Sequence, residues 1–186
     1  MSEFPVIDRS WTLFLDRDGV INHEKQNDYV YNYSEFIFYP GALDALRLLA
    51  ERFGRIIIIT NQRGVEKKLM TEDDLILLHG QMVAAVEEHG GKIDAIYYCT
   101  SLENNHPDRK PQPGMALKAK KSFPEIDFRK TFMVGNNISD MQFGKNAGTL
   151  TAFVLTTSPD QVIPHESIDF HFKDLAGFAN AVESQI

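Results

Sequence analysis

The stretch Phe14-Leu15-Asp16-Arg17-Asp18-Gly19-Val20-Ile21-Asn22 decides how the rest of the chain is interpreted. Residues 11–15 are mostly apolar, as in a buried strand, and Asp16 falls where this strand gives way to a loop. Side chains two apart on extended backbone share a side, so Asp16 and Asp18 should face one site while Arg17 faces elsewhere. Paired carboxylates need a cation or a shared proton, which indicates a hard metal ion, acid–base chemistry, or both. Taken alone, the motif is equally compatible with an ordinary acidic turn.

Length and charge limit the class of protein. A chain of 186 residues with a net charge of −7 predicts a single domain, residues 1–186, with a sizeable core. The acidic balance argues against nucleic acid and anionic membranes as partners, although Arg109 and Lys110 form a local basic patch suited to a small anion. No apolar run is long enough for a signal peptide or a bilayer span, so we expect a cytoplasmic protein. We also expect a monomer. One cysteine, Cys99, excludes an internal disulfide framework.

Apolar runs and amphipathic stretches alternate along the chain. Strands are predicted at residues 11–15, 56–60, 95–99, 131–134, 151–155 and 170–172. Helices are predicted from Pro40-Gly41 to Gly54, from the Thr71–Asp74 cap to Gly90-Gly91, after Pro113, up to Gly148, and from Leu175 onward. The polar, tyrosine-rich segment 23–39 has no clear period and is interpreted as an excursion over the end of the first strand. This rhythm predicts an α/β fold: a doubly wound, Rossmann-like parallel sheet with helices on both faces.

Polar residues follow several of these strands directly. Asp16 and Asp18 follow the first strand, Thr60 and Asn61 end the second, and the segment 136–140 follows the fourth. Ligands of such sheets bind beyond the carboxyl ends of the strands, so these residues should converge, with Lys110 reaching in from a loop. Carboxylates, a hydroxyl, an amide and a cation are the groups that phosphoryl transfer requires. No Gly-x-Gly-x-x-Gly follows a strand and no P-loop ending is present, which argues against a dehydrogenase or a P-loop nucleotidase.

Four segments in the expected order carry a family resemblance. They are Asp16-Arg17-Asp18-Gly19, Thr60-Asn61-Gln62, Arg109-Lys110-Pro111-x-Pro-Gly-Met115 and Val134-Gly135-x-x-x-x-Asp140-Met141. Together they resemble the four motifs of the haloacid dehalogenase superfamily of phosphatases, in the branch containing D-glycero-D-manno-heptose 1,7-bisphosphate phosphatases and histidinol phosphatases. The resemblance implies a minimal cap and a small sugar phosphate as substrate. The heptose 1,7-bisphosphate 7-phosphatase reaction of lipopolysaccharide biosynthesis is the first expectation, and histidinol phosphate hydrolysis is the alternative.

The resemblance also implies roles for individual residues. Asp16 would be the nucleophile that forms an aspartyl-phosphate, and Asp18 the acid and then the base of the two half-reactions. Mg²⁺ would lie between the Asp16 carboxylate, the Asp18 backbone carbonyl and the loop from Asn136 to Asp140. The expected phosphate- or substrate-binding residues are Gly19, Asn22, Thr60, Asn61, Arg109 and Lys110.

The fourth motif departs from the family pattern. Asn136 stands where the family has an acid that ligates Mg²⁺, and Asn137 stands where the heptose branch often has lysine. An amide oxygen still completes a magnesium coordination shell but carries no charge, so metal affinity should fall unless Asp140 moves in. Two outcomes stay open: retained Mg²⁺-dependent turnover, or a weakly active or non-catalytic phosphate-binding protein.

A second departure concerns zinc. Many members of the branch hold zinc with three cysteines and a histidine in the loop after the third strand. Here only Cys99 and His106 remain, so we expect no zinc. The remaining histidines show no ligand spacing. The tyrosines of the excursion form either a lid over the pocket or ordinary surface packing, namely Tyr29, Tyr31, Tyr33 and Tyr39.

Overall fold

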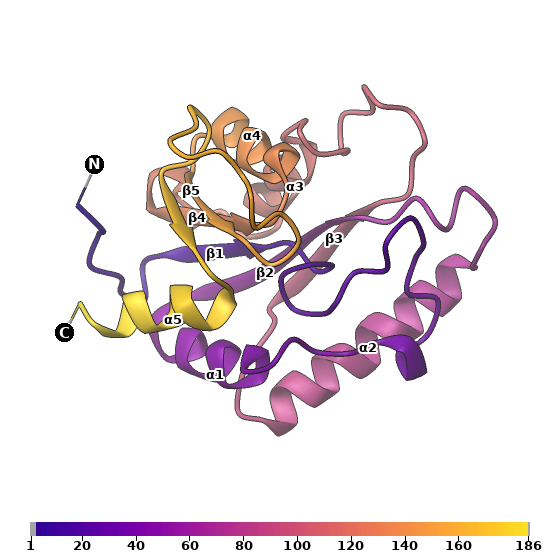
Figure 1. The fold of residues 1–186 in the computed structure, drawn as a ribbon, viewed down its shortest axis with the longest axis horizontal. Helices are drawn as coiled ribbons and strands as arrows, with labels where there is room; N and C mark the ends of the chain where they lie inside the picture. The colour runs from indigo at the N-terminus through magenta and orange to yellow at the C-terminus, as the bar shows by residue number, and fades with distance from the viewer. Residues whose placement is uncertain (1–2, 186) are drawn as a thin grey trace.

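The computed structural model of the chain describes residues 3–185 and contains one six-stranded sheet (Figure 1). All paired strands run parallel, in the order β3-β2-β1-β4-β5-β6. The predicted doubly wound parallel sheet is therefore confirmed. The strands are β1 Thr12–Leu15, β2 Arg55–Asn61, β3 Ala95–Cys99, β4 Thr131–Gly135, β5 Leu150–Val154 and β6 Phe170–Phe172.

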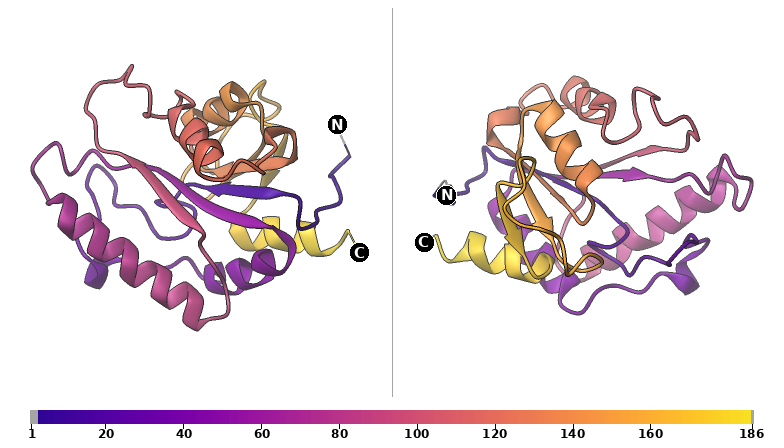
Figure 2. Two further views of the ribbon diagram at one scale, coloured as in Figure 1. Left: turned by 180° about the vertical axis from the view of Figure 1, so that it is seen from behind. Right: turned by 45° about the horizontal axis from the view of Figure 1, so that its top comes forward.

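Helices cover both faces of the sheet (Figure 2). One face carries α1 (Ala42–Arg52), α2 (Glu72–Glu88) and α5 (Leu175–Glu183), and the other carries α3 (Gly114–Ser122) and α4 (Ile138–Ala147). Two short 3-10 turns, Tyr33–Glu35 and Phe128–Lys130, lie in the connections. Among residues 3–185, no helix combines the length and apolar character needed to cross a membrane.

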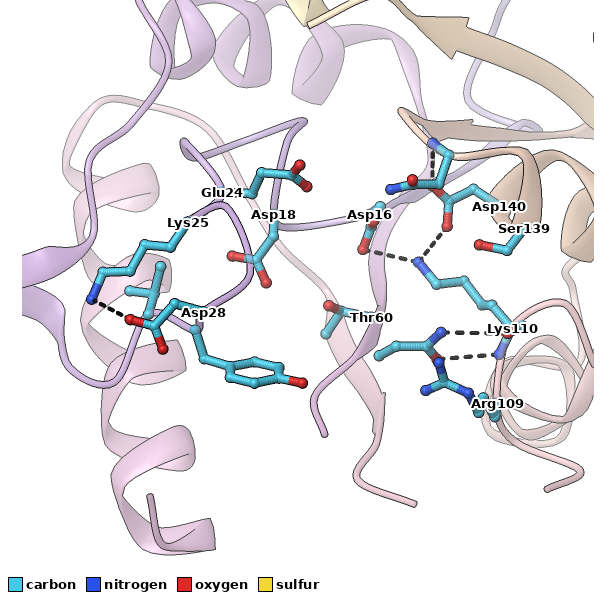
Figure 3. A pocket seen from close by; sticks show the side chains of 14 residues that line it. Asp16, Asp18, Glu24, Lys25, Asp28, Thr60, Arg109, Lys110, Ser139 and Asp140 are labelled. Carbon is cyan, nitrogen blue, oxygen red and sulfur yellow. Dashed lines mark hydrogen bonds and ion pairs between the residues drawn. The ribbon is translucent and has the colours of Figure 1, made fainter. Parts of the chain in front are cut away.

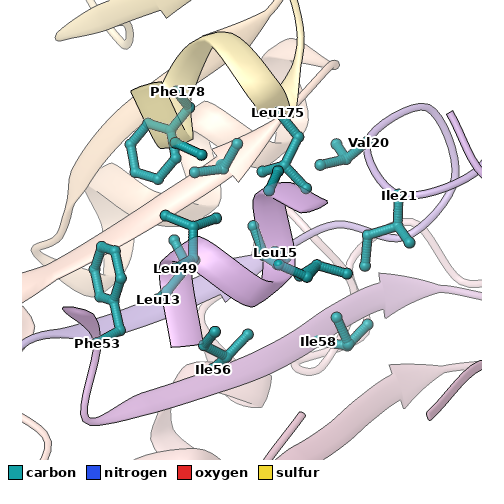
Figure 4. Packing of buried hydrophobic residues seen from close by; sticks show 14 of the residues in the cluster. Leu13, Leu15, Val20, Ile21, Leu49, Phe53, Ile56, Ile58, Leu175 and Phe178 are labelled. Carbon is teal, nitrogen blue, oxygen red and sulfur yellow. The ribbon is translucent and has the colours of Figure 1, made fainter. Parts of the chain in front are cut away.

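The period of two along the strands divides the core into two clusters. Leu13 and Leu15 of β1 face the layer of α1, α2 and α5, whereas Phe14 between them faces the layer of α3 and α4. The run of isoleucines in β2 divides in the same way, with Ile56 and Ile58 on the first side (Figure 4). A strand that is apolar at every position thus fills two cores, which explains the unbroken apolar run.

Caps fix where the helices begin and end. Asp74 N–H donates to Thr71 Oγ1 at 3.1 Å and Thr71 N–H donates to Asp74 Oδ2 at 2.9 Å, which confirms the predicted capping box of α2. Gly148, in the left-handed region at φ 85°, ends α4 as expected. The predicted strand at 151–155 is shifted by one residue, because pairing with β4 already begins at Leu150.

The order of the strands places the site. β1 lies between β2 and β4, and the chain leaves the edge strand β3 through α3 to continue on the other side of β1. The connections at the carboxyl ends of β1 and β4 therefore diverge to opposite faces and leave a crevice between them. Asp16 immediately follows β1 and Asn136 immediately follows β4, so both lie at this crevice.

Candidate active site

Lys110 joins two carboxylates at the base of the crevice. Its Nζ lies 2.9 Å from Asp16 Oδ1 and 2.7 Å from Asp140 Oδ1, and it donates to the backbone carbonyl of Ile59 at 2.9 Å (Figure 3). All three side chains are nearly inaccessible to solvent. Burial alone lowers the pKa of Lys110, but Asp140 and Asp16 outweigh burial and raise it. The lysine is therefore a fixed cation beside Asp16.

Asp16 is a buried carboxylate whose environment disfavours its charge. Burial raises the pKa of Asp16 to about 7, Asp140 and Asp18 add like charge, and Lys110 opposes them. A cation or an electrophile that enters the crevice next to Asp16 meets a carboxylate that few hydrogen bonds stabilise. Such a group is suited to bind a metal or to attack an electron-poor atom.

Asp18 lies in a contrasting environment. Burial raises the pKa of Asp18, but Arg17 and the hydrogen bonds from Asn22 and Gln62 outweigh burial and lower it. Arg17 donates to both carboxylate oxygens at 2.8–3.2 Å, Asn22 Nδ2 donates at 2.9 Å, and Gln62 Nε2 donates at 2.9 Å. Two carboxylates two residues apart thus have pKa values shifted in opposite directions, as in sites that divide acid–base and nucleophilic roles.

Both carboxylates line one cavity of about 270 Å³, as the spacing predicted (Figure 3). Of the other predicted site residues, Thr60, Asn61, Arg109, Lys110 and Asp140 also line it. Asn61 Oδ1 accepts from the Lys110 N–H at 3.1 Å and so ties the second strand's loop to the lysine loop. Unpredicted lining residues are Glu24, Lys25, Asp28, Tyr29, Val30, Asn137 and Ser139.

Gly19, Asn22 and Asn136 lie behind the lining of the cavity. Gly19 was expected to bind phosphate or substrate, but its N–H donates to the Asn22 carbonyl at 2.8 Å. Gly19 instead leaves space: a Cβ there would lie 2.1 Å from Asn136 Nδ2, and its φ of +85° favours glycine. Asn22 is fully buried and contacts Asp18, so the structure gives it a contact with that carboxylate and no place in the cavity lining.

Arg17 is the largest contribution to the site that the sequence did not predict. Its side chain faces away from the cavity, as expected, but its guanidinium turns back to Asp18 and also lies 3.1 Å from His79 Nε2 of α2. Arg17 is fully buried. The burial of His79 lowers its pKa to about 3, and the positive charge of Arg17 contributes to this shift. The sequence offered one sign of these contacts, which is that Arg17 is a charged residue within a largely apolar strand-to-loop segment.

The tyrosines of the excursion have separate surroundings. Tyr29 lines the cavity, whereas Tyr31 donates to Asp28 at the surface and Tyr33 stacks on Phe36. Tyr39 lies against His23, with ring centroids 3.9 Å apart. Packing therefore accounts for these three, and Tyr29 alone of the four lies at the cavity.

Comparison with known proteins agrees with this geometry. A model of the family described as polynucleotide kinase 3 phosphatase matches residues 7–184. The chain is 42% identical over 140 residues to the D-glycero-alpha-D-manno-heptose-1,7-bisphosphate 7-phosphatase of Campylobacter jejuni, covering 74% of this chain and 79% of that one. The chain belongs to the haloacid dehalogenase phosphatases. It is a phosphoric monoester hydrolase of the heptose bisphosphate branch.

Other members of the branch match over nearly their whole length. The D-glycero-beta-D-manno-heptose-1,7-bisphosphate 7-phosphatase of Yersinia pestis is 32% identical over 187 residues, covering 93% of this chain and 95% of the relative. The crystal structure of D,D-heptose 1,7-bisphosphate phosphatase from B. bronchiseptica, complexed with magnesium and phosphate, superposes with a TM-score of 0.85 at 28% identity. That match covers 95% of this chain and 99% of the other.

The residues of this family member offer a donor set of oxygens for a divalent ion. Within residues 3–185, no three Asp, Glu, His or Cys side chains converge as a preformed metal site. Asp16 and Asp140 nevertheless flank the crevice, and Asn136 Oδ1 is a buried acceptor without a hydrogen-bond partner in the described part of the chain. Mg²⁺ takes oxygen ligands and keeps several waters, so this set fits it, with one carboxylate fewer than the family pattern.

The remnant of the zinc loop is a single pair of side chains. Cys99 Sγ lies 3.7 Å from His106 Nδ1, and burial raises the pKa of the Cys99 thiol. The expectation that this family member holds no zinc stays a prediction.

Proposed function

We propose that the protein hydrolyses D-glycero-D-manno-heptose 1,7-bisphosphate at C7 in a Mg²⁺-dependent reaction. The relatives of the branch carry this activity in their names, and the B. bronchiseptica structure contains magnesium and phosphate. The observation that carries the proposal is the pair Asp16 and Asp18, which share one cavity with the buried Lys110 cation. Together these residues offer the nucleophile, the acid–base group and the cation that an aspartyl-phosphate mechanism requires.

In the first step, an Asp16 carboxylate oxygen attacks phosphorus in line with the ester bond. The new bond joins Asp16 oxygen to phosphorus, and the bond from phosphorus to the sugar oxygen breaks. Lys110 lies against the other Asp16 oxygen and balances charge as the phosphoryl group transfers. Thr60 and Arg109, which also line the cavity, provide donors for the phosphoryl and sugar oxygens.

Asp18 gives its proton to the leaving sugar oxygen and then takes one from the water that cleaves the aspartyl-phosphate. In the ligand-free site the hydrogen bonds from Arg17, Asn22 and Gln62 keep the pKa of Asp18 low, although burial raises it. A phosphate dianion beside Asp18 raises that pKa through like charge and so favours the protonated acid. The same three donors hold the carboxylate in place for both half-reactions.

Asp16, the Asp18 backbone carbonyl, Asn136 and Asp140 are the groups that would hold Mg²⁺. When bound, the ion supplies positive charge to the transferring phosphoryl group. The uncharged Asn136 favours a second candidate, a weakly active phosphate-binding protein, because the site has one carboxylate fewer than the family pattern.

The test is phosphate release across a Mg²⁺ titration with heptose 1,7-bisphosphate and histidinol phosphate in parallel. We expect release from the bisphosphate that saturates with Mg²⁺ and disappears in Asp16→Asn. Release from histidinol phosphate alone would overturn the substrate. No release from either ester, together with Mg²⁺-dependent release by Asn136→Asp, would establish the second candidate.

A further inference from the structure

Asn136 has a fixed amide orientation. The residue is fully buried, and its Nδ2 donates to Thr157 Oγ1 at 2.7 Å and to Glu24 Oε2 at 3.4 Å. A carboxylate only accepts hydrogen bonds, so Glu24 identifies this side of the amide as the nitrogen side. The other amide atom of Asn136 is therefore Oδ1, a buried acceptor to which no described residue donates a hydrogen bond.

The unpartnered oxygen lies next to the nucleophile loop. The Asn136 side chain packs against Gly19, where a Cβ would come within 2.9 Å of Oδ1, so it borders the peptide that follows Asp18. A buried acceptor that stays unpaired destabilises the folded protein. Thr157 and Glu24 hold the amide in the orientation that leaves Oδ1 unpaired, so Oδ1 can accept a ligand such as a divalent cation.

Glu24 brings a negative charge to the same place. It lines the cavity together with Asp16, Asp18 and Asp140 (Figure 3). In the described residues Glu24 forms no ion pair with Lys or Arg, whereas Asp16, Asp18 and Asp140 each have one. A cation in the crevice would therefore compensate a charge that the protein itself leaves uncompensated.

We propose that Thr157 and Glu24 are positioning residues that present Asn136 Oδ1 to a divalent cation, and that Glu24 supplies the carboxylate charge that Asn136 lacks. The proposal rests on the metal dependence of the proposed function. It implies that the negative charge that the family pattern has at position 136 is provided here by Glu24, in the excursion after β1. Glu24 would then act on the cation without binding it directly.

Binding of Mn²⁺ alone to the full-length protein tests the proposal without turnover. The dissociation constant is measured from the electron paramagnetic resonance signal of free Mn²⁺. We expect Glu24→Gln to weaken binding about tenfold, as for other groups that support metal ligands indirectly. Thr157→Val keeps the charge but frees the amide, and it should weaken binding by a smaller factor. Glu35→Gln removes a carboxylate from the same excursion at a position outside the cavity lining, and its Mn²⁺ affinity should stay within twofold of the parent.

The Asn136→Asp background tests whether the charge is shared between the two positions. Asn136→Asp should tighten Mn²⁺ binding, and in that background Glu24→Gln should change the affinity less than twofold. An equal loss in both backgrounds would overturn the proposal, as would Glu24→Gln binding Mn²⁺ like the parent. Glu24→Asp, which restores the charge, should recover part of the affinity, and unfolding midpoints in EDTA confirm that each variant is folded.

Failure of the proposed function gives a different pattern. A parent that binds no Mn²⁺ would overturn both the metal dependence and this inference. A parent that binds Mn²⁺ and is indifferent to Glu24 and Thr157 would overturn this inference and leave the metal dependence standing.

Discussion

Asp16 and Asp18 differ in what supports their charges. Asp16 is one of two carboxylates that share Lys110, whereas Asp18 is the ion-pair partner of the fully buried Arg17. Replacing Asp16 leaves Lys110 paired with Asp140 and removes repulsion between acids. Replacing Asp18 leaves the charge of Arg17 buried and unpaired.

We therefore expect two inactive variants with opposite stabilities. Asp16→Asn and Asp18→Asn should each reduce turnover by roughly 10³-fold or more. In urea unfolding, Asp16→Asn should be as stable as the parent or more stable, and Asp18→Asn less stable by about 3 kcal/mol. Equal stabilities of the two variants would show that Asp18 does not compensate the charge of Arg17.

His79 gives the stability of the protein a specific dependence on pH. Burial and Arg17 lower its pKa from 6.5 to about 3, so the folded protein binds fewer protons than the unfolded chain between these values. The contribution is complete above pH 6.5 and is lost progressively as the pH falls toward 3. In that window His79→Gln should remove up to about 1.4 kcal/mol of pH dependence per unit.

Urea unfolding at pH 7, 6, 5 and 4.5 of parent and His79→Gln measures this difference. His89→Gln is the matched control, because His89 is exposed on α2's end and its partner Asp44 is exposed as well. Parallel curves for parent and His79→Gln would contradict the buried neutral histidine.

The positions of site residues were predictable where a motif carries them and not where a long-range contact does. Asp16, Asp18, Thr60 and Lys110 follow strands whose ends meet, so their convergence at one cavity could be predicted. Arg17 meets His79 only because α2 packs on the face of the sheet toward which the Arg17 side chain turns, and Glu24 lies in a segment without any period. No local pattern encodes either contact.

At the scale of elements, α2 depends on its cap. Thr71 and Asp74 satisfy two N–H groups at the start of the 17-residue helix that carries the buried His79. Thr71→Ala should lower the free energy of unfolding by about 1 kcal/mol, measured by urea denaturation. Glu87→Ala, exposed near the other end of α2, should change it by less than about 0.5 kcal/mol. Equal effects of both substitutions would show that the cap contributes nothing specific.

Most helices and strands were predictable because their apolar patterns agree with their caps. The isoleucine run of β2 and the Thr71 cap of α2 each specify one structure. Residues 23–39 were predictable only as an excursion, since their packing comes from distant parts of the core, against which Tyr33 and Phe36 lie. Boundaries shifted by a residue where pairing with a neighbouring strand decided them, as at Leu150.

At the scale of the whole molecule, ligands should stabilise the fold through the crevice. Five acids line the cavity there, and two of them, Asp16 and Asp140, pair with the buried Lys110 ammonium, so a bound cation relieves repulsion that the free protein bears. With Mg²⁺ and inorganic phosphate each at about 100 times the dissociation constant, the unfolding free energy should rise by about 2.7 kcal/mol or more. The measurement is thermal unfolding, with EDTA or with NaCl at equal ionic strength as the control. An unfolding midpoint equal to that of the controls would contradict ligand binding at the crevice.

The whole fold was predictable because alternating strands and helices allow few arrangements. Right-handed crossovers place the helices on both faces, and the order of strands then puts β1 beside β4. The shape of the cavity was not predictable, because it depends on how the excursion 23–39 and the loop before α3 lie over the carboxyl ends of the strands.

Each of the three protons on the Lys110 ammonium points to its own oxygen, on Ile59, Asp16 and Asp140. Lysine ammonium groups at a protein surface trade their hydrogens with water continually, but these hydrogens have no route to solvent while all three bonds persist. In deuterated buffer the isotope at Lys110 is therefore replaced only when the crevice opens or a ligand displaces one of its partners. The hydrogen-exchange rate of the Lys110 ammonium therefore measures how often the site rearranges.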